Sequence, residues 1–591
     1  MKVLMTGNEA IARGAYEAGV HFASAYPGTP STEILENIAQ YKDVLYAEWA
    51  PNEKVAFEAA VGASIAGARA LSTMKHVGVN VAADPLFTFT YTGVTGGFVL
   101  VSADDPGMHS SQNEQDNRNY ASFSRTLMLE PANSQEAKDY IKLGYELSER
   151  FNTPVMLRVT TRVCHSKSPV ELTERKEVEV VPYVKNIEKF VATPANGKVL
   201  RRKLVDRIAA MTAYSNETEI NRAEYNGNEI GVITAGVAYQ YAKEVFGEDA
   251  SYLKLGMTFP LPMEKIREFA GKVKKLYIIE EMDPYMETQI KAAGIPCIGK
   301  EVIPEYDELN PDVVRQAVFG TKTETIETEA KAVARPPVMC AGCPHRGFFY
   351  ALSIKKNVMI TGDIGCYTLG SAAPLNAMDT CIDMGASIST GHGASKVYQR
   401  AGIDKRVVSV IGDSTFFHTG INSLMNVVYN GGNNITVILD NRTTGMTGHQ
   451  DNPGTGYTLM GEKAVEADIP AICKAIGVKE ENILQVNPLE LRDMNKIINL
   501  ALKNEEATVI ICKWPCVLKK FTPEDRAEFD VRRKKSWINQ DKCTQCRVCT
   551  RTGCPAIYNG ELITIDPLTC VGCSLCRQVC AFKAIEEVVE E

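Results

Sequence analysis

The chain has 591 residues, of which 45% are hydrophobic and 23% charged, and its net charge is −8. This length predicts several domains, and the composition excludes a disordered, collagen-like or coiled-coil chain. The mildly acidic balance argues against a broad nucleic-acid surface, and no stretch is apolar enough for a membrane span. Because the N-terminus also shows no signal peptide, we expect a cytoplasmic protein.

The first informative segment is a turn of proline and glycine that follows a short predicted strand. It reads Tyr26-Pro27-Gly28-Thr29-Pro30-Ser31. A helical stretch of small residues is predicted at 56–70, and two glutamates, Glu53 and Glu58, lie at its beginning. Five positions on a helix correspond to a rotation of about 140°, so these two side chains do not easily share one pocket.

Further along, short β-branched runs alternate with helical stretches of small residues. This rhythm predicts an α/β protein with parallel sheets flanked by helices, which bind ligands at the carboxyl ends of their strands. Polar segments near 165–200 and 321–337 indicate domain boundaries. The predicted strands lie at 155–159, 230–234, 276–279, 358–361, 407–411, 435–439 and 509–512.

Two of these strands end in glycine–aspartate turns. The turns read Gly362-Asp363-Ile364-Gly365-Cys366 and Gly412-Asp413-Ser414, and the strand after the second turn ends in Asp440-Asn441. A glycine at such a position lets the backbone approach a phosphate. The side chains of Asp413 and Asn441 supply hard oxygen ligands for Mg²⁺, which then bridges to a diphosphate.

Eight of the 17 cysteines form two runs near the C-terminus. The runs are Cys543-x2-Cys546-x2-Cys549-x4-Cys554 and Cys570-x2-Cys573-x2-Cys576-x3-Cys580. The displaced fourth cysteine of each run can reach a second centre, so we expect two 4Fe-4S clusters with crossed ligands. Zinc also accepts four thiolates, although zinc ribbons show two separated Cys-x2-Cys pairs. The expected ligand sets are Cys543, Cys546, Cys549 and Cys580 for the first cluster, and Cys554, Cys570, Cys573 and Cys576 for the second.

These runs resemble the bacterial two-cluster ferredoxins over roughly residues 535–591. The sequence departs from that pattern at two places. Four residues instead of three precede Cys554, and Ala581 replaces the usual proline after the last cysteine. The resemblance implies that this segment conducts electrons for chemistry that takes place upstream.

The second glycine–aspartate turn and the asparagine that follows it resemble the motif of thiamine-diphosphate enzymes, with Ser414 in place of a glycine. The resemblance implies a thiamine diphosphate beside Gly412, Asp413 and Ser414. It also implies an Mg²⁺ ion held by Asp413, Asn441 and the backbone carbonyl of Thr443.

Thiamine-diphosphate enzymes also need a buried glutamate that protonates the aminopyrimidine of the cofactor. In the family, this glutamate opens a small-residue helix in the N-terminal domain. Glu53 precedes Gly62 by nine positions, which is the family spacing, and Glu58 is the competing candidate.

The turn at 26–31 resembles the Tyr-Pro-x-Thr-Pro-Ser element of the 2-oxoacid:ferredoxin oxidoreductases. Together with Lys75-His76-Val77-Gly78, Cys340-x2-Cys343 and the C-terminal cysteines, it makes the whole chain similar to the alpha subunits of indolepyruvate:ferredoxin oxidoreductases. This resemblance implies that Thr29 and His76 face the substrate. It further implies cofactor contacts from Tyr26, Pro27, Gly28, Thr29, Gly362, Asp363, Gly365 and Cys366.

The activity implied by the resemblance is oxidative decarboxylation of aryl pyruvates, such as indolepyruvate and phenylpyruvate, to arylacetyl-CoA and CO₂. CoA is the cosubstrate, and electrons pass through the clusters to ferredoxin. The expected partner is a smaller beta subunit, in a heterotetramer of two alpha and two beta chains. Two alternatives stay open: another 2-oxoacid such as pyruvate or a branched-chain oxoacid, and a non-catalytic electron-transfer subunit with a degenerate thiamine fold.

The expected organisation has five parts. They are a pyrimidine-binding domain at 1–170, a transketolase-C-like domain at 171–325, a diphosphate- and magnesium-binding domain at 326–520, a charged linker at 521–536 and a ferredoxin-type domain at 537–591. Cys340 and Cys343 are expected to form a turn near the cofactor. The neighbouring His345 and Arg346 are candidate contacts for phosphate or CoA.

Overall fold

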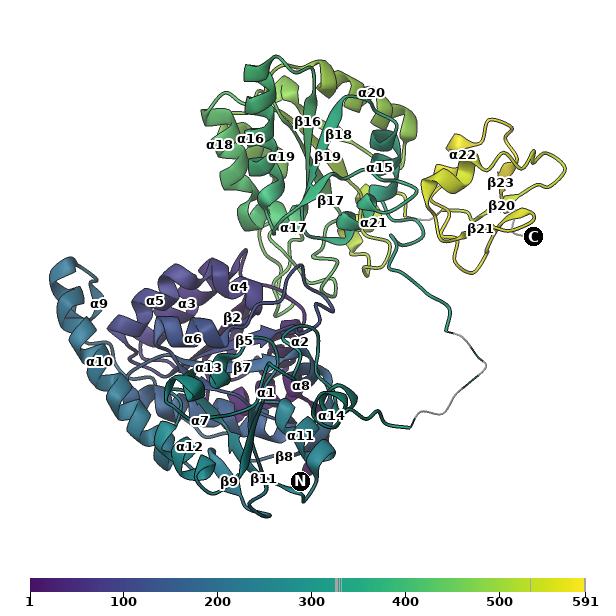
Figure 1. The fold of residues 1–591 in the computed structure, drawn as a ribbon. Coiled ribbons are helices and arrows are strands. Elements are labelled where there is room, and N and C mark those ends of the chain that lie inside the picture. Colours follow the sequence, from purple (N-terminus) through teal and green to yellow (C-terminus); the bar gives the residue numbers. More distant parts are fainter. Residues whose placement is uncertain (325–327, 329, 331, 532, 589–591) are drawn as a thin grey trace. The chain divides into compact units, whose positions relative to one another are not determined.

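The computed structural model describes residues 1–324, 328, 330, 332–531 and 533–588. The chain divides into two compact units, Met1–Glu329 and Ala330–Glu591 (Figure 1). The predicted domain boundary between 325 and 326, and position 532 of the predicted linker, lie outside the described residues. Among the described helices, none is both long and apolar enough to cross a membrane.

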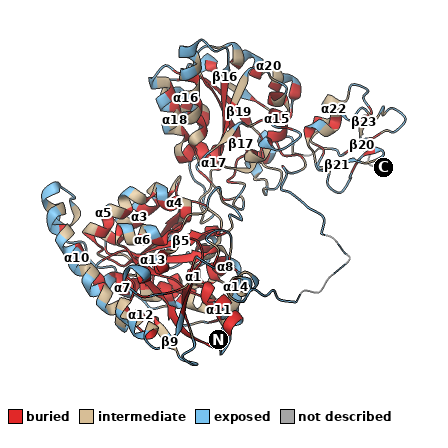
Figure 2. Ribbon diagram, viewed as in Figure 1, coloured by how far each residue is buried: buried red, intermediate tan, exposed pale blue. Residues whose placement is uncertain are grey.

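A seven-stranded sheet organises the first unit. Its strands are parallel except for the edge strand β12, and those at its centre are buried along their whole length, as expected for a sheet covered on both faces (Figure 2). In spatial order the strands are β12 (Met257–Phe259), β6 (Leu127–Leu129), β7 (Val155–Thr160), β5 (Phe98–Asp104), β4 (Ala70–Lys75), β2 (Phe22–Ala25) and β3 (Tyr46–Trp49).

A second sheet of four strands packs in the same unit. Residues of both sheets, among them Phe98, Ile233 and Leu253, belong to one hydrophobic cluster, so the two sheets share a single core. The strands are β13 (Lys275–Ile279), β10 (Ile230–Ala235), β11 (Ala250–Leu255) and the antiparallel β9 (Arg222–Glu224). A separate antiparallel pair joins β1 (Lys2–Thr6) to β8 (Lys167–Glu171).

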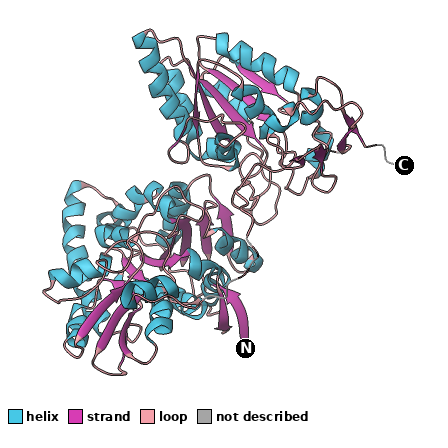
Figure 3. Cartoon of the chain, turned by 45° about the vertical axis from the view of Figure 1, so that its right-hand side comes forward, coloured by secondary structure: helices cyan, strands magenta, loops and turns pink. Residues whose placement is uncertain are grey.

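Helices surround both sheets of the first unit (Figure 3). They are α1 (Gly7–Glu17), α2 (Thr32–Ile38), α3 (Glu53–Ile65), α4 (His76–Val81), α5 (Ala83–Thr92), α6 (Arg118–Ser124), α7 (Ser134–Phe151), α8 (Thr161–His165), α9 (Ile187–Phe190), α10 (Pro194–Glu217), α11 (Ala238–Phe246), α12 (Met263–Ala270), α13 (Tyr285–Ala292) and α14 (Pro311–Phe319).

The helix predicted at 56–70 occupies different residues, because its ends are fixed by local contacts. Asn52 caps the start of α3 by accepting a hydrogen bond from the backbone N–H of Val55 at 2.9 Å. The helix ends at Ile65, and Gly67 follows with a φ of 97°, which favours glycine. Ala70 already begins β4, so the last predicted turn belongs to a strand.

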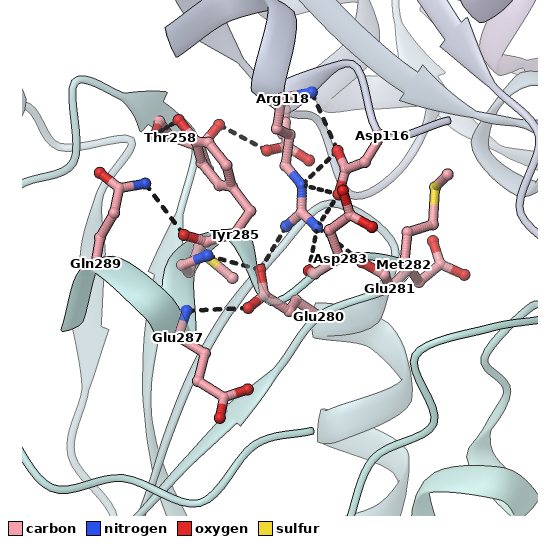
Figure 4. A network of polar contacts seen from close by, with 12 residues as sticks. Asp116, Arg118, Thr258, Glu280, Glu281, Met282, Asp283, Tyr285, Glu287 and Gln289 are labelled. Atoms are coloured by element: carbon pink, nitrogen blue, oxygen red, sulfur yellow. Dashed lines mark hydrogen bonds and ion pairs between the residues drawn. The ribbon is translucent and has the colours of Figure 1, made fainter. Parts of the chain in front are cut away.

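A buried arginine ties the two sheets of the first unit together (Figure 4). Arg118, on α6, lies 2.6 Å from Glu280, which follows β13 of the second sheet. It also pairs with Asp116 at 2.5 Å and donates to the backbone oxygen of Glu281 at 2.7 Å. Breaking a buried pair by removing one partner costs about 3–5 kcal/mol, so this junction holds the two sheets in a fixed relation.

The second unit is built on a six-stranded sheet whose strand pairs are all parallel. One hydrophobic cluster packs α15 (His345–Ser353) and α20 (Leu491–Lys503) against the sheet, and another packs α18 (Ile421–Tyr429) and α19 (Ile469–Ile476). A further helix, α16 (Ala386–Ala401), contacts β14 and β16. The strands, in spatial order, are β15 (Thr380–Cys381), β14 (Val358–Gly362), β16 (Arg406–Gly412), β17 (Ile435–Asp440), β19 (Thr508–Lys513) and β18 (Ile483–Val486). The predicted α/β class with parallel sheets is confirmed.

A small cysteine-rich module completes the second unit. Two antiparallel pairs, β20 (Ser536–Ile538) with β23 (Ile585–Glu587) and β21 (Ile557–Asn559) with β22 (Ile563–Ile565), surround a core of isoleucines and cysteines. A short helix, α22 (Leu575–Val579), packs Leu575 against Leu489 and Trp514 of the six-stranded domain. The side chain of Gln578 adds hydrogen bonds to the backbone of Leu489 and Leu491, at 2.7 and 2.9 Å.

Candidate active site and cysteine groups

Two aspartates lie side by side at the carboxyl edge of the six-stranded sheet. Because Gly412 pairs with Leu439, the register places Asp413 next to Asp440. Burial raises the pKa of Asp413, and the negative charge of Asp440 raises it further. Asp440 is also faced by the charges of Lys513 and Arg442. The expected donors, a carboxylate from Asp413, an amide oxygen from Asn441 and the carbonyl of Thr443, are hard oxygen ligands, so the donor set fits the expected Mg²⁺.

A loop from 441 to 452 folds over this edge and holds its side chains. Asn452 donates from Nδ2 to Oδ2 of Asp413 at 3.1 Å. The side-chain oxygen of Asn441 accepts from the backbone N–H of Thr443 at 3.3 Å, and Thr444 donates to the hydroxyl of Ser414 at 3.0 Å. The predicted residues Asp413, Ser414, Asn441 and Thr443 are therefore brought together. Asn452 joins them without any sequence signal, since it lies far along the loop.

The glycines of the two turns make room for protein side chains. A Cβ atom on Gly412 would lie 2.7 Å from a ring carbon of Tyr367, and one on Gly365 would lie 2.4 Å from the same ring. At Gly362, a Cβ would meet Met378. The lack of a side chain at Gly412 is therefore required by the packing of Tyr367, in addition to any approach of the backbone to a phosphate.

Asp363 is buried and uses its carboxyl group to hold a helix start. It accepts hydrogen bonds from the backbone N–H groups of Gly385 at 2.6 Å and Ser387 at 3.2 Å, at the beginning of α16. Burial raises its pKa to about 6, although these hydrogen bonds act in the opposite direction. This aspartate therefore fixes the helix next to the site.

In the first unit, the structure separates the two candidate glutamates. Glu53 is the first residue of α3 and is 7% exposed. Its carboxyl group packs against Gly78, where an added Cβ would lie 2.8 Å from Oε1. Glu58 is exposed and forms an ion pair with Lys54. Only Glu53 has the burial that the aminopyrimidine partner requires.

The turn at 26–31 lies beside the residues that follow β4. A Cβ on Gly28 would be 3.1 Å from that of Lys75, and the hydroxyl of Ser110 donates to the backbone oxygen of Thr29 at 3.2 Å. Lys75 in turn donates from Nζ to the backbone oxygen of Ser110. The carboxyl ends of β2, β4 and β5 thus bring Thr29, Lys75 and the loop after β5 into one polar site.

Burial lowers the pKa of two basic groups of this site, His76 and Lys75. Burial lowers the pKa of His76 to about 4, with a further contribution from Lys75, so its imidazole is neutral at neutral pH. Its Nε2 lies 3.2 Å from the backbone oxygen of Asn113. Burial also lowers the pKa of Lys75 to about 8, while Asp105 opposes the shift. Lys75 is a site residue that the sequence analysis had not assigned.

The C-terminal cysteines form two groups in the crossed arrangement. Four of them line one cavity together with apolar side chains, namely Cys543, Cys546, Cys549 and Cys580. In the other group, burial raises the pKa of Cys576 to about 12, and the thiols of Cys573, Cys554 and Cys570, and more weakly that of Cys549 from the first group, raise it further.

Four further cysteines lie close together in the second unit, namely Cys340, Cys343, Cys366 and Cys516. Burial raises the pKa of Cys366 to about 11, and the thiols of Cys516 and Cys340 raise it further. The pKa of Cys343 is about 12 for the same reasons, with Cys516 and Cys366 as neighbours. Four thiols from three distant segments are thus within electrostatic reach of one another. The sequence showed only the Cys340-x2-Cys343 pair.

Comparisons with known proteins follow the same two units. Residues 13–229 match the family described as pyruvate flavodoxin/ferredoxin oxidoreductase, thiamine diphosphate-binding, and residues 363–512 match the thiamine pyrophosphate enzyme, C-terminal TPP binding domain. The chain is 41% identical to the indolepyruvate oxidoreductase subunit IorA of Archaeoglobus fulgidus, with 99% of this chain and 97% of that protein aligned. The chain belongs to the IorA family.

Two other proteins are also similar to the chain. The IorA protein of Pyrococcus abyssi is 38% identical, with 100% of this chain and 97% of the relative aligned. A solved 2-oxoglutarate:ferredoxin oxidoreductase from Magnetococcus marinus is 17% identical, covers 54% of this chain and 64% of its own, and has a TM-score of 0.45.

One expectation for this member of the IorA family is corrected by the structure. Arg346 was a candidate contact for phosphate or CoA, but its guanidinium is buried and donates to backbone oxygens, among them those of Cys340 and Thr552, each at 2.9 Å. His345 is also buried, and its ring lies edge-on to Tyr367 with centroids 6.3 Å apart. His345 and Arg346 are the first two residues of α15. This helix packs against the cysteine-rich module, so both side chains are buried in the protein interior.

Proposed function

We propose that this chain is the catalytic alpha subunit of a thiamine-diphosphate-dependent indolepyruvate:ferredoxin oxidoreductase. The observation that carries the proposal is 41% identity to an indolepyruvate oxidoreductase subunit over nearly the full length of both proteins. The reaction is oxidative decarboxylation of aryl pyruvates to arylacetyl-CoA and CO₂. CoA is the cosubstrate, ferredoxin is the electron acceptor, and the partner is a smaller beta subunit in a heterotetramer of two alpha and two beta chains.

Thiamine diphosphate, when bound, supplies a nucleophilic carbon and an electron sink that allow a 2-oxoacid to lose CO₂. Asp413, Asn441 and the backbone carbonyl of Thr443 would hold the Mg²⁺ ion of its diphosphate, and Asn452 orients Asp413 by its hydrogen bond. Glu53 would hold the proton at the aminopyrimidine ring nitrogen. Its burial against Gly78 supports this assignment over Glu58.

The substrate end of the site would use Thr29, His76 and Lys75. Because Nε2 of the neutral His76 donates to the backbone oxygen of Asn113, its Nδ1 is available as a hydrogen-bond acceptor. Lys75 has one hydrogen-bond partner among the described residues, the backbone oxygen of Ser110, and an ammonium group has three donors. We therefore propose that the ammonium group of Lys75 binds the carboxylate of the oxoacid. Replacing Lys75 with Met should raise KM for the oxoacid more than it lowers kcat, and Lys75→Arg should recover part of the loss.

The C-terminal module is proposed to be a ferredoxin-type domain with two 4Fe-4S clusters. The crossed grouping of its cysteines supports this proposal, because one set lines a cavity and the other set is electrostatically coupled. Iron analysis of anaerobically purified protein should give about eight atoms per chain. Stoichiometric zinc in place of iron would contradict it. We also propose that the chain has the five-part domain organisation predicted from the sequence.

The test of the whole proposal is turnover by the anaerobically purified alpha–beta complex. Ferredoxin or viologen reduction is measured with indolepyruvate, phenylpyruvate and pyruvate, each with and without CoA. We expect the aryl pyruvates to give the highest kcat/KM. Faster turnover of pyruvate or a branched-chain oxoacid would assign the same chemistry to another substrate, and no turnover of any oxoacid would leave the non-catalytic alternative.

A further inference from the structure

The unusual spacing before Cys554 has a structural counterpart. The four residues between Cys549 and Cys554 complete a short 3₁₀ helix, Val548–Thr552, which ends at Gly553 with a φ of 68°. The hydroxyl of Thr552 donates to the backbone oxygen of Cys549 at 2.7 Å, and Thr552 is buried. The longer segment therefore turns the backbone oxygen of Thr552 away from its own helix, where another group can reach it.

The group that reaches it is Arg346. From the first turn of α15, its Nη1 donates to the backbone oxygen of Thr552 at 2.9 Å, and its Nη2 donates to that of Cys340 at 2.9 Å. A Cβ on Gly553 would lie 3.2 Å from Nη1, so the guanidinium touches the residue that precedes Cys554. One buried side chain thus joins the Cys340 turn to the second cluster-ligand group.

Among the residues that the structure describes, Arg346 pairs with backbone oxygens, those of Met339, Cys340 and Thr552, and with no carboxylate. Its hydrogen-bond acceptors are neutral carbonyl groups, and the side chain is 1% exposed. A buried positive charge in a medium of low dielectric stabilises an added electron nearby far more than an exposed charge does. Reduction of a cluster adds one negative charge. The positive charge of Arg346 therefore stabilises the reduced form of the cluster next to it.

The cysteine-rich module also packs against the six-stranded domain through the group that contains Cys573. Cys573, Leu575 and Val579 pack with Leu489 and Trp514, whereas Cys546 of the other group is exposed. The group of Cys554, Cys570, Cys573 and Cys576 is therefore the one nearer the domain that carries Asp413. This position makes it the entry point for electrons into the module.

We propose that Arg346 is a positioning residue that docks the cysteine module and raises the reduction potential of the cluster held by Cys554, Cys570, Cys573 and Cys576. The inference rests on the proposed two-cluster domain. It assigns a role to the extra residue before Cys554, because a shorter segment would lack the carbonyl that Arg346 binds. Arg346 contacts Gly553 directly before Cys554, whereas Thr552 lies between it and Cys549 of the other group, so we expect its charge to act less on the cluster held by Cys543, Cys546, Cys549 and Cys580.

The test is a reductive titration of the anaerobic alpha–beta complex, followed by EPR, on the wild type and three variants. Arg346→Met removes the charge, Arg346→Lys keeps it, and Arg551→Met is a matched control because Arg551 is exposed and one residue from Thr552. In Arg346→Met, the ratio of reduced to oxidised cluster at a fixed potential should fall at least tenfold for one cluster, which corresponds to a negative shift of about 59 mV. The other cluster should shift less than half as far, and Arg346→Lys should shift the first cluster less than half as far as Arg346→Met does.

A Cys543→Ser variant identifies the signal of the other cluster, whose potential should shift less than half as far in Arg346→Met. Iron content is measured for every variant, and Arg346→Gln replaces Arg346→Met if the latter does not fold. Unchanged potentials in a fully iron-loaded neutral variant, or a shift of the marked cluster instead, would overturn the inference. Absence of iron from the wild type would contradict the cluster proposal itself, so the two failures are distinguishable.

Discussion

Substituting Gly78 with alanine should displace the proposed catalytic acid while leaving the fold intact. Gly78 lies in α4, and an added Cβ would be 2.8 Å from both Cγ and Oε1 of Glu53. Ordinary contact begins at 3.4 Å, so the carboxyl group has to move by about 0.6 Å. Since a 1 Å misplacement in an active site can cost about 100-fold, we expect kcat to fall by roughly tenfold.

The free energy of unfolding of this variant should fall by no more than about 2 kcal/mol, because two effects oppose each other. Alanine is more favourable than glycine inside a helix by about 1 kcal/mol, and overpacking costs about 1–3 kcal/mol. Gly62→Ala is the matched control: Gly62 lies in α3, and its added Cβ would meet nothing within 4 Å. The control should keep wild-type activity and gain up to about 1 kcal/mol in the free energy of unfolding.

The assay combines ferredoxin reduction with exchange of the thiazolium C2 proton, and thermal unfolding monitors the fold. Exchange should slow in Gly78→Ala by the same factor as kcat, because the displaced Glu53 acts before the oxoacid reacts. A Gly78→Ala enzyme with wild-type exchange and turnover would refute the assignment of Glu53 or the packing that places it. A loss of the same size in Gly62→Ala would show that helix substitutions act nonspecifically.

Three other outcomes are expected. Glu53→Gln should abolish C2 proton exchange whereas Glu58→Gln should not, and the reverse pattern would move the role to Glu58. Asn452→Ala should raise the Mg²⁺ concentration for half-maximal activity by roughly fivefold, because Asp413 loses a hydrogen bond worth about 1 kcal/mol; an unchanged Mg²⁺ requirement would contradict this. Burial raises the pKa of Glu17, but its hydrogen bonds outweigh burial and lower the pKa from 4.5 to about 2. The stability that Glu17 contributes should therefore be complete above pH 4.5 and lost as the pH falls towards 2, and urea unfolding of Glu17→Gln should depend less on pH in that window.

Much of the parallel-sheet framework could be predicted because its signals are local. The apolar runs at 407–411 and 435–439 are long enough to identify β16 and β17, and a parallel register then brings their ends together. Asp413 follows the first of these strands directly, so its position at the sheet edge needed no knowledge of distant residues. The hydrophobic pattern alone does not predict the first residue of α3, because the helix start is set by a single capping contact from Asn52.

The sequence by itself determined which residue types carry the chemistry and in what order they occur, namely the glutamate pair Glu53 and Glu58, the Gly412-Asp413 turn and the two cysteine runs. Spacing along a helix showed that Glu53 and Glu58 do not share a pocket, but only the packing of Gly78 against Glu53 decided which one is buried. Tertiary structure alone placed Lys75 beside Thr29, and Arg346 between the Cys340 turn and Thr552. The reason is physical: strand and helix signals arise from neighbours in the chain, whereas burial and charge at a site arise from segments that meet only when the chain folds.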